Sequence, residues 1–243
     1  MQYNAAADFL KDRVIIITGA GSGIGSAVAK SYASYGATVV LLDKNIPALE
    51  QVYDNIIANG SATPALYPLD LKGAKISDYD DLVMSIHDNF GRLDGLVHCA
   101  ASLGQVSPVQ HQDPQVWLET LQINLTAPYL LTRACLALMQ KYDHASIVFT
   151  TDNHKSKAYW SAYGVSKAGI ESLSKQLADE MESDGRIRVN CIDPGNVMTS
   201  LHSQAFPGIN PNTLVAPEDI VANYLYLMSN DSLESNGELI KAQ

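Results

Sequence analysis

One stretch near the start of the chain, residues 13–25, constrains the fold more than any other. Its sequence is RVIIITGAGSGIG, and residues 14–17 are four consecutive β-branched apolar residues. Such a run, without alternation of apolar and polar residues, is typical of a strand buried on both faces of a parallel sheet. The glycines that follow predict a tight turn into a helix over about residues 26–33. The stretch therefore predicts a strand, a turn and a helix of an α/β fold.

The glycine turn has the spacing of a phosphate-binding turn. Gly19 allows backbone dihedral angles that other residues avoid, Gly23 lets a pyrophosphate approach the main chain, and Gly25 lets the helix pack close to the strand. The free N–H groups and the positive dipole end of the helix would then face the anion. A glycine-rich turn without a ligand is the alternative. The position of this turn between a buried strand and a helix favours the phosphate site.

Composition and charge argue against several classes of protein. The 243 residues are 47% hydrophobic and 17% charged, without a linker or an internal repeat, which predicts a single domain over residues 1–243. The net charge of −10 argues against a nucleic-acid partner. No apolar run approaches about 18 residues and no cationic leader precedes one, so we expect a cytoplasmic protein with no membrane partner. The three cysteines lie far apart and predict neither disulfides nor a metal site.

Strands and helices alternate along the rest of the chain. Further strands are predicted over residues 37–42, 65–69, 93–101, 146–151, 187–192 and 238–240. Helices are predicted at about residues 47–60, 77–90, 113–142, 159–181 and from 217 onward, with a kink near Asn124 and Pro128. Right-handed crossovers then place helices on both faces of the sheet, so we expect a three-layer, doubly wound parallel sheet. The long loop at about residues 195–215 is the candidate substrate lid.

Asp43, at the end of the predicted second strand, bears on the choice of cofactor. It lies 18 residues after Gly25, close to where a dinucleotide-binding fold places an acid that accepts hydrogen bonds from the adenosine ribose. A carboxylate there would repel the extra phosphate of NADP, so we expect NAD to be favoured over NADP, although Lys44 adjoins it. Alternatively, Asp43 caps the helix that begins near Pro47.

Five motifs are spread over nearly the whole chain. They are Thr18-Gly19-xxx-Gly23-Ile24-Gly25, Asp70, Asn124, Tyr163-Gly164-Val165-Ser166-Lys167, and Pro194-Gly195 with Thr199. Their order and separation resemble those of the short-chain dehydrogenase/reductase family. The resemblance implies a Rossmann fold with a seven-stranded parallel sheet in the order 3-2-1-4-5-6-7. It also implies an NAD(P)-dependent oxidoreductase with a small-molecule substrate, commonly assembled as a homodimer or homotetramer.

The resemblance further implies which residues form the site. Catalysis would use Tyr163, Lys167 and Asn124, with Asn124 holding a water that links Lys167 to solvent. The dinucleotide would be bound by residues near the carboxyl ends of several strands, namely Gly19, Ser22, Gly23, Ile24, Gly25, Asp43, Asp70, Leu71, Cys99, Ala100, Ala101, Tyr163, Lys167, Pro194, Gly195, Val197 and Thr199.

Tyr163 and Lys167 lie four residues apart and so share one face of the predicted helix. Hydride transfer to or from a carbon that bears oxygen needs a group that gives or takes the proton of that oxygen. A tyrosine with a pKa near 10 is a poor base at neutral pH, but a lysine charge about 4 Å away would favour the phenolate by up to about 4 kcal/mol. We therefore expect Tyr163 to transfer the proton, and Lys167 to lower the pKa of Tyr163 and hold the nicotinamide ribose.

Residues 98–101 depart from the family's pattern. They read His-Cys-Ala-Ala, where the family usually has Asn-Asn-Ala-Gly. His98 has no metal-ligand partner at a suitable spacing, and we expect it to be a hydrogen-bonded core residue rather than a catalytic one.

A second departure follows the fifth predicted strand, where the family usually has a serine that holds the substrate oxygen. The chain reads Thr150-Thr151-Asp152-Asn153 there. Counting from the strand selects Asp152, counting back from Tyr163 selects Thr150, and Thr151 could supply a hydroxyl instead. An ionised aspartate accepts hydrogen bonds but cannot donate one, which would suit an alcohol or a cationic substrate.

Two functions fit these residues. The first is an NAD(P)-dependent oxidoreductase that acts on a secondary alcohol or a ketone, which the presence of Asn124, Tyr163 and Lys167 favours. The second is a dinucleotide-binding sensor or scaffold with little catalysis, which the missing serine favours. Apolar stripes on the two long helices predict self-association. These stripes are Leu121, Leu125 and Tyr129 on one helix and Ile170, Leu173 and Leu177 on the other.

Overall fold

A computed structural model describes residue 3 and residues 5–243 of the chain. Seven parallel strands form one sheet in the order β3-β2-β1-β4-β5-β6-β7, which confirms the predicted α/β fold and strand order. The strands are β1 (Val14–Thr18), β2 (Thr38–Asp43), β3 (Ala65–Pro68), β4 (Gly95–His98), β5 (Ala145–Thr150), β6 (Ile187–Asp193) and β7 (Leu239–Lys241).

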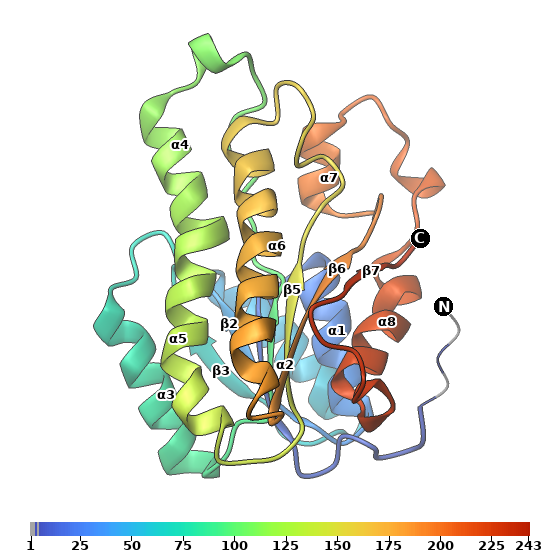
Figure 1. The fold of residues 1–243 in the computed structure, drawn as a ribbon. Helices are drawn as coiled ribbons and strands as arrows, with labels where there is room; N and C mark the ends of the chain where they lie inside the picture. Colours follow the sequence, from blue (N-terminus) through green and yellow to red (C-terminus); the bar gives the residue numbers. More distant parts are fainter. Residues whose placement is uncertain (1–2, 4) are drawn as a thin grey trace.

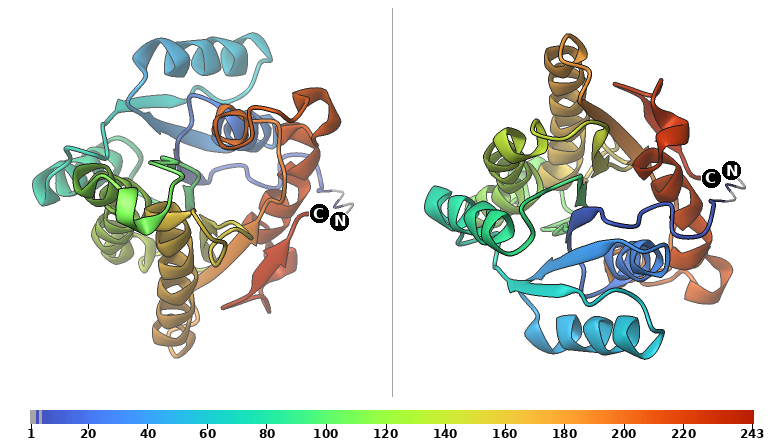
Figure 2. Two further views of the ribbon diagram at one scale, coloured as in Figure 1. Left: turned by 90° about the horizontal axis from the view of Figure 1, so that it is seen from above. Right: turned by 90° about the horizontal axis from the view of Figure 1, so that it is seen from below.

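Helices lie on both faces of this sheet (Figures 1 and 2). They are α1 (Gly23–Ser34), α2 (Ile46–Ala58), α3 (Ile76–Phe90), α4 (Pro114–Leu121), α5 (Ala127–Met139), α6 (Ser161–Glu182), α7 (Ser200–Ala205) and α8 (Val221–Met228). Helices α1, α2 and α8 share one apolar core with the sheet, and α3, α5 and α6 share the other. The three-layer arrangement is therefore as predicted.

The residues of β1 show why an unbroken apolar run is needed here. Ile15 and Ile17 belong to the core beneath α1 and α8, whereas Val14 and Ile16 belong to the core beneath α3 and α5. Side chains alternate between the two faces of a strand, so a strand covered on both faces needs an apolar residue at every position. All five residues of β1 are buried.

The strand order reverses between β1 and β4, which places a crevice at the carboxyl ends of these two strands. The chain runs outward from β1 through β2 to β3 and then returns to β4 on the other side of β1. Such a reversal is where open α/β sheets bind their ligands. The hydroxyl of Thr18 joins the two strand ends by accepting the N–H groups of Cys99 and Ala100, each at 3.2 Å.

The predicted helix over residues 113–142 is interrupted rather than simply kinked by proline. A π-helical turn, Gln122–Thr126, separates α4 from α5. Pro128 follows this turn in a segment that stays helical throughout, so its missing N–H group leaves one helical hydrogen bond unmade at the π-helical turn. The distortion therefore centres on the turn that contains Asn124.

The segment at residues 195–215, expected to be a loop, contains helix α7 and a short 3-10 helix, Pro211–Thr213. The Thr199 hydroxyl caps α7 by accepting the N–H group of His202 at 3.2 Å. Val197 and Val215 form an isolated parallel bridge that closes the base of the segment. Helix α7 was not predicted because its six residues are too few to show a periodic apolar pattern.

Two smaller differences concern element ends. The strand predicted over residues 93–101 is limited to β4, and helix α3 begins one residue before Ser77. The carboxylate of Asp78 accepts the N–H group of Lys75 at 2.7 Å and so caps the start of α3.

None of the helices formed by residue 3 and residues 5–243 combines the length and apolar character that crossing a membrane requires. The same residues contain no group of three or more His, Cys, Asp or Glu side chains that could hold a metal ion.

His98 is a core residue, as expected from the sequence. Only 5% of it is exposed, its Nε2 lies 2.9 Å from the Thr132 hydroxyl, and its ring stacks on Phe149 at 4.7 Å. Burial, with a smaller contribution from the Lys167 charge, lowers the pKa of His98 to about 3. The folded chain therefore holds this imidazole neutral.

Acid should destabilise the chain through His98. The unfolded histidine has a pKa near 6.5, so below that pH protons favour the unfolded chain, and the loss grows until the pH reaches the folded value of about 3. We expect His98→Asn to lose less stability than the wild type between about pH 7 and pH 4, by an amount on the order of 3 kcal/mol. Urea unfolding at each pH measures this. Exposed His111→Asn is the control, and equal slopes in the wild type and His98→Asn would contradict the prediction.

Candidate active site

A cavity of about 540 Å³ lies at the carboxyl ends of the strands. All the residues proposed from the sequence to bind the dinucleotide line it, including the glycine turn, Asp43, Asp70, residues 99–101, and Pro194, Gly195, Val197 and Thr199. Tyr163, Lys167, Thr151 and Asp152 line the same cavity. The sequence candidates, which are far apart along the chain, therefore meet in one place.

The glycine turn is too close to its neighbours to carry side chains. A Cβ atom at Gly25 would lie 2.2 Å from the carbonyl oxygen of Gly19, and one at Gly19 would lie 2.8 Å from the Cα atom of Ala100. Gly19 and Gly23 also have positive φ angles of 69° and 51°. No side chain caps the start of α1 at Ser22. The N–H groups of this helix end therefore remain available to an anion.

Asp43 does not cap α2. Asn45 does so, because its side chain accepts the N–H group of Ala48 at 3.2 Å. Instead, the Asp43 carboxylate accepts the N–H groups of Gly21 at 3.2 Å and Asn45 at 3.0 Å. These bonds hold a negative charge against the glycine turn, at the adenosine end of the expected dinucleotide.

Tyr163 and Lys167 lie on the buried face of α6, as their spacing predicted. They are 4% and 5% exposed, and Nζ of Lys167 lies 5.5 Å from the centre of the Tyr163 ring. Nζ donates a hydrogen bond to the carbonyl oxygen of Thr150 at 2.8 Å. That bond fixes the ammonium group between β5 and α6.

The pKa of Tyr163 departs from its ordinary value in the direction opposite to that expected. Burial raises it well above 10, and the charge and hydrogen bond of Asp152 raise it further. Burial lowers the pKa of Lys167, while Asp152 acts in the other direction. The expectation considered nearby positive charge and left out burial, which is the largest cause, and the Asp152 carboxylate, which contacts the phenol directly.

Asn124 lies behind the cavity wall rather than in it. Its side-chain oxygen accepts the N–H group of Ser102 at 2.7 Å, and its amide group donates to the Ser102 carbonyl at 2.8 Å and the Ser166 hydroxyl at 3.2 Å. Both amide hydrogens are engaged within the protein. The Asn124 side chain therefore fixes the segment after β4 against α6, and the expected role of holding a water gains no support from these contacts.

Of the three candidates for the serine position, Asp152 contacts Tyr163. The Tyr163 hydroxyl donates to Oδ2 of Asp152 at 2.9 Å. The Thr151 hydroxyl instead donates to Glu171 at 2.8 Å, and the Thr150 hydroxyl lies 3.0 Å from the Tyr224 hydroxyl. Counting from the strand therefore selects the residue beside the phenol.

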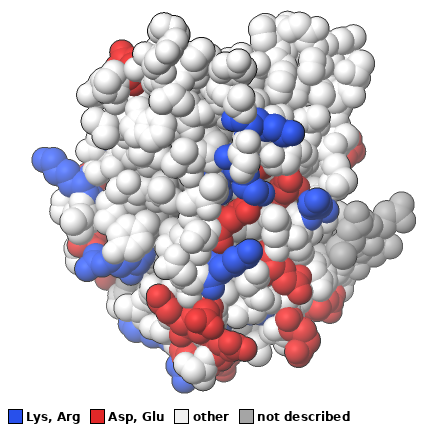
Figure 3. All heavy atoms as spheres, turned by 45° about the horizontal axis from the view of Figure 1, so that its top comes forward, with Lys and Arg blue, Asp and Glu red and all other residues white. Residues whose placement is uncertain are grey.

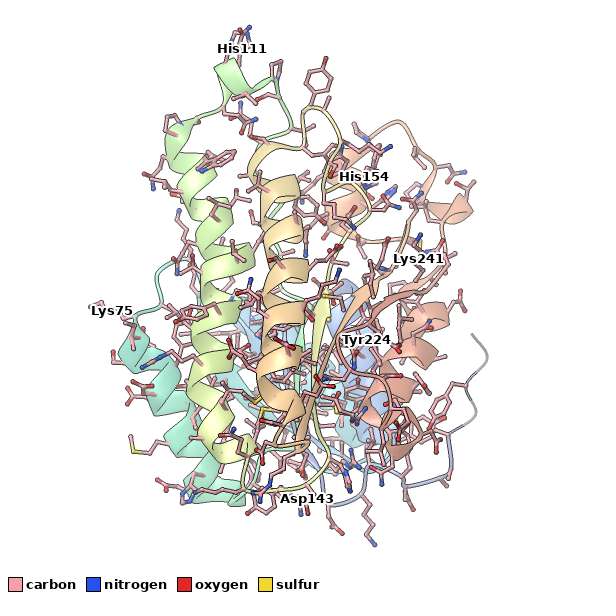
Figure 4. The ribbon with its side chains drawn as sticks, in the orientation of Figure 1. Lys75, His111, Asp143, His154, Tyr224 and Lys241 are labelled. Atoms are coloured by element: carbon pink, nitrogen blue, oxygen red, sulfur yellow. The ribbon has the colours of Figure 1, made fainter. Side chains whose placement is uncertain are left out.

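Two residues of the cavity wall, His154 and Trp160, were missed in the sequence. His154 lies between α6 and α7 in Figure 4, and its ring stacks on Trp160 with the ring centres 4.2 Å apart. Trp160, Leu103 and Tyr163 form a small apolar cluster, against which Leu201 and Phe206 pack. The available signal was His154 itself, an ionisable residue only two positions after Asp152.

Gly25→Ala should weaken dinucleotide binding, because the added Cβ would overlap the Gly19 carbonyl and displace the turn. We expect the Kd for NADH to rise at least about tenfold, which corresponds to about 1.4 kcal/mol. Fluorescence titration measures it. Gly73→Ala is the matched control, because nothing lies within 4 Å of its Cβ position. A folded Gly25→Ala variant with an unchanged Kd would contradict the assignment.

Comparison with known proteins agrees with this geometry. Residues 13–210 match the family model described as short chain dehydrogenase. The chain is 41% identical over 245 residues to the uncharacterized oxidoreductase YciK of Escherichia coli K12, covering 100% of this chain and 96% of YciK. It is 31% identical over 242 residues to D-threitol dehydrogenase of Mycolicibacterium smegmatis, covering 95% of this chain and 91% of that protein.

A solved structure extends the likeness. A short chain dehydrogenase from Escherichia coli CFT073, complexed with NADPH, matches with a TM-score of 0.95 at 42% identity, covering 98% of this chain and 100% of that one. This chain therefore belongs to the short-chain dehydrogenase/reductase family and is an oxidoreductase that binds a nicotinamide dinucleotide.

Proposed function

We propose that the chain transfers hydride between NAD(H) and a secondary alcohol or ketone. The observation that carries this proposal is the placement of Tyr163 and Lys167 in the same cavity as the glycine turn. A sensor or scaffold without catalysis would not need a buried phenol and a buried ammonium group, both of which cost free energy to desolvate. We also propose that residues 1–243 act as a single catalytic domain.

The dinucleotide fits the residues present. The uncapped start of α1 and the Cβ-free surfaces of Gly19 and Gly25 suit a diphosphate, and Asp43 suits ribose hydroxyls. When bound, the nicotinamide ring supplies or accepts the hydride. Lys167 uses one N–H group on Thr150 and has others for the nicotinamide ribose. Tyr163 gives or takes the proton of the substrate oxygen.

The substrate side of the cavity favours an uncharged, partly apolar molecule. Leu103, Trp160 and Phe206 contribute apolar surface there. The end of the molecule that carries α4 and α7 shows mostly uncharged side chains in Figure 3. We propose that α7 and its flanking residues, 195–215, form the substrate lid, because Leu201 and Phe206 pack over the cluster that contains Tyr163. The name of the relative D-threitol dehydrogenase supports an alcohol as substrate.

Helices α4, α5 and α6 supply a surface for self-association into a homodimer or homotetramer. Leu118, Tyr129 and Val165 are 61%, 48% and 49% exposed on these helices. Ile170 and Leu177, which the sequence pattern assigned to the same role, are buried in the core instead. Sedimentation of the chain measures its mass in solution.

Removing the Tyr163 hydroxyl should remove turnover. We expect Tyr163→Phe to lower kcat by about a hundredfold or more, the usual contribution of general acid–base catalysis, and to change the Kd for NADH less than about twofold. Nicotinamide absorbance measures turnover with cyclohexanol, cyclohexanone and acetophenone. Tyr159→Phe, an exposed tyrosine close by, is the control. Tight NADH binding without turnover of any of these compounds by the wild type would favour the sensor.

Asp43 should make NAD the preferred dinucleotide, although the E. coli CFT073 relative was crystallised with NADPH. The carboxylate would meet the extra phosphate of NADP as a like charge, which the neighbouring Lys44 offsets in part. We expect Asp43→Asn, which keeps the acceptor for Gly21, to raise the ratio of NADP⁺ to NAD⁺ affinity about tenfold or more. Exposed Asp54→Asn is the control. Tighter binding of NADP⁺ than NAD⁺ by the wild type would show that the preference is wrong.

A further inference from the structure

Three polar groups form a continuous chain from the buried phenol toward the surface. The Tyr163 hydroxyl donates to Oδ2 of Asp152 at 2.9 Å. The other oxygen, Oδ1, accepts the backbone N–H group of His154 at 2.7 Å and lies 2.6 Å from Nδ1 of the His154 ring. Tyr163 is 4% exposed, whereas the side chains of Asp152 and His154 are 20% and 19% exposed. These hydrogen bonds therefore link the Tyr163 hydroxyl to solvent.

The protein holds the Asp152–His154 pair in place from two sides. The backbone bond from His154 to Asp152 closes a tight turn directly after β5. The His154 ring stacks on Trp160 at 4.2 Å and lies 5.5 Å from the Phe206 ring of the segment after α7. These contacts therefore hold the Asp152 carboxylate in a fixed position beside the phenol.

A carboxylate differs chemically from the serine that the family usually places here. A serine hydroxyl can donate a hydrogen bond to a substrate, whereas an ionised carboxylate can only accept a hydrogen bond or take a proton. The nearby hydroxyls do not replace it, because those of Thr150 and Thr151 are bonded to Tyr224 and Glu171.

We propose that Asp152 is a catalytic acid/base that exchanges a proton with the substrate through the Tyr163 hydroxyl, and that His154 positions Asp152 and controls its charge. The proposal rests on the proposed function, since it needs a hydroxyl or carbonyl substrate beside Tyr163. It gives the phenol a second role, because Tyr163 then passes a proton on as well as receiving one.

The proton steps balance in both directions. As the alcohol is oxidised, its C–H hydride reduces the nicotinamide, its O–H bond breaks, and its proton forms a new O–H bond at Oη of Tyr163. In the same step the original phenolic proton moves to Oδ2 of Asp152. The product is a neutral ketone beside a neutral Asp152, which then releases the proton to solvent at its exposed edge. Ketone reduction runs these transfers in reverse.

Several charged or titratable groups surround the pair and enter its pH dependence. Tyr163 and Lys167 face Asp152 from α6. The charge of Asp193, at the end of β6, raises the pKa of Tyr163. His202 of α7 interacts electrostatically with both Asp152 and His154. Lys155, next to His154, is paired with Glu171 at 2.6 Å. A protonated His154 disfavours transfer of a proton to Asp152. The charge of the His154 ring therefore bears on proton transfer to Asp152.

A turnover-independent experiment tests the contact. Asp152→Asn keeps the shape of the side chain but removes its negative charge. We expect the Tyr163 phenol to ionise about one pH unit lower, or more, in Asp152→Asn than in the wild type. Carbon-13 NMR of labelled tyrosines follows this ionisation, and Tyr163→Phe assigns the signal. An unchanged midpoint would overturn the proposal.

Kinetics with NAD⁺ and cyclohexanol test the proton transfer. We expect oxidation to slow about a hundredfold in Asp152→Asn and also in Asp152→Ser, which restores the family's hydroxyl without a base. His154→Gln should keep a larger share of the rate and have a different pH profile, because it lacks the ring whose charge acts on Asp152. Wild-type rates in Asp152→Ser would overturn the proposal, because Asp152 would then only take the place of serine.

The chain offers a matched control pair on its surface. His87 and Asp88 on α3 are adjacent, with Nδ1 and Oδ1 3.5 Å apart and side chains 54% and 70% exposed. Asp88→Asn and His87→Gln should leave the rate, its pH profile and the Tyr163 midpoint unchanged. If the wild type oxidises neither cyclohexanol nor the other compounds, the proposed function fails, while the NMR midpoint still decides whether Asp152 controls the phenol.

Discussion

The close approach of backbone to backbone at the glycine turn is the constraint on which the rest of the structure depends. Gly25 brings the first turn of α1 against the carbonyl of Gly19, and Gly19 in turn lies against Ala100 at the end of β4. These contacts leave no room for a Cβ atom, so the ends of β1 and β4 and the start of α1 meet at one point. The cavity opens at that point, where the strand order reverses.

Burial of ionisable groups shifts the pKa values of the residues around Lys167 and Tyr163. Lys167 and His98 lie close together in a desolvated region, where the ammonium group lowers the pKa of the imidazole and burial lowers both. Burial also raises the pKa of the Cys99 thiol to about 11, which keeps this cavity residue protonated. Asp152 lies nearer to solvent and accepts a hydrogen bond from the phenol. Burial and the carboxylates of Asp152 and Asp193 all raise the pKa of Tyr163, so its state does not follow from Lys167 alone.

Much of the site was accessible from the sequence because its parts are local. The strand before the glycines, Asp43 at a strand end, and Tyr163 and Lys167 one helical turn apart each follow from short-range spacing. Parallel strands bring their carboxyl ends to one edge, so these residues were expected together. The π-helical turn at Asn124 and the short helix α7 were not predictable in this way, because their geometry depends on what packs against them. The cytoplasmic location stays a prediction.

The sequence by itself determined the alternation of strands and helices, the glycine turn and the pair on α6, because apolar periodicity and glycine spacing act over a few residues. The strand order was implied by the family resemblance rather than by these patterns. Only the tertiary structure decided which of residues 150–152 meets the phenol, that Asn45 rather than Asp43 caps α2, and that His154 joins Asp152. The physical reason is that side-chain direction after a strand is set by the turn that follows and by long-range packing against Trp160 and α7. No spacing rule along the chain carries that information.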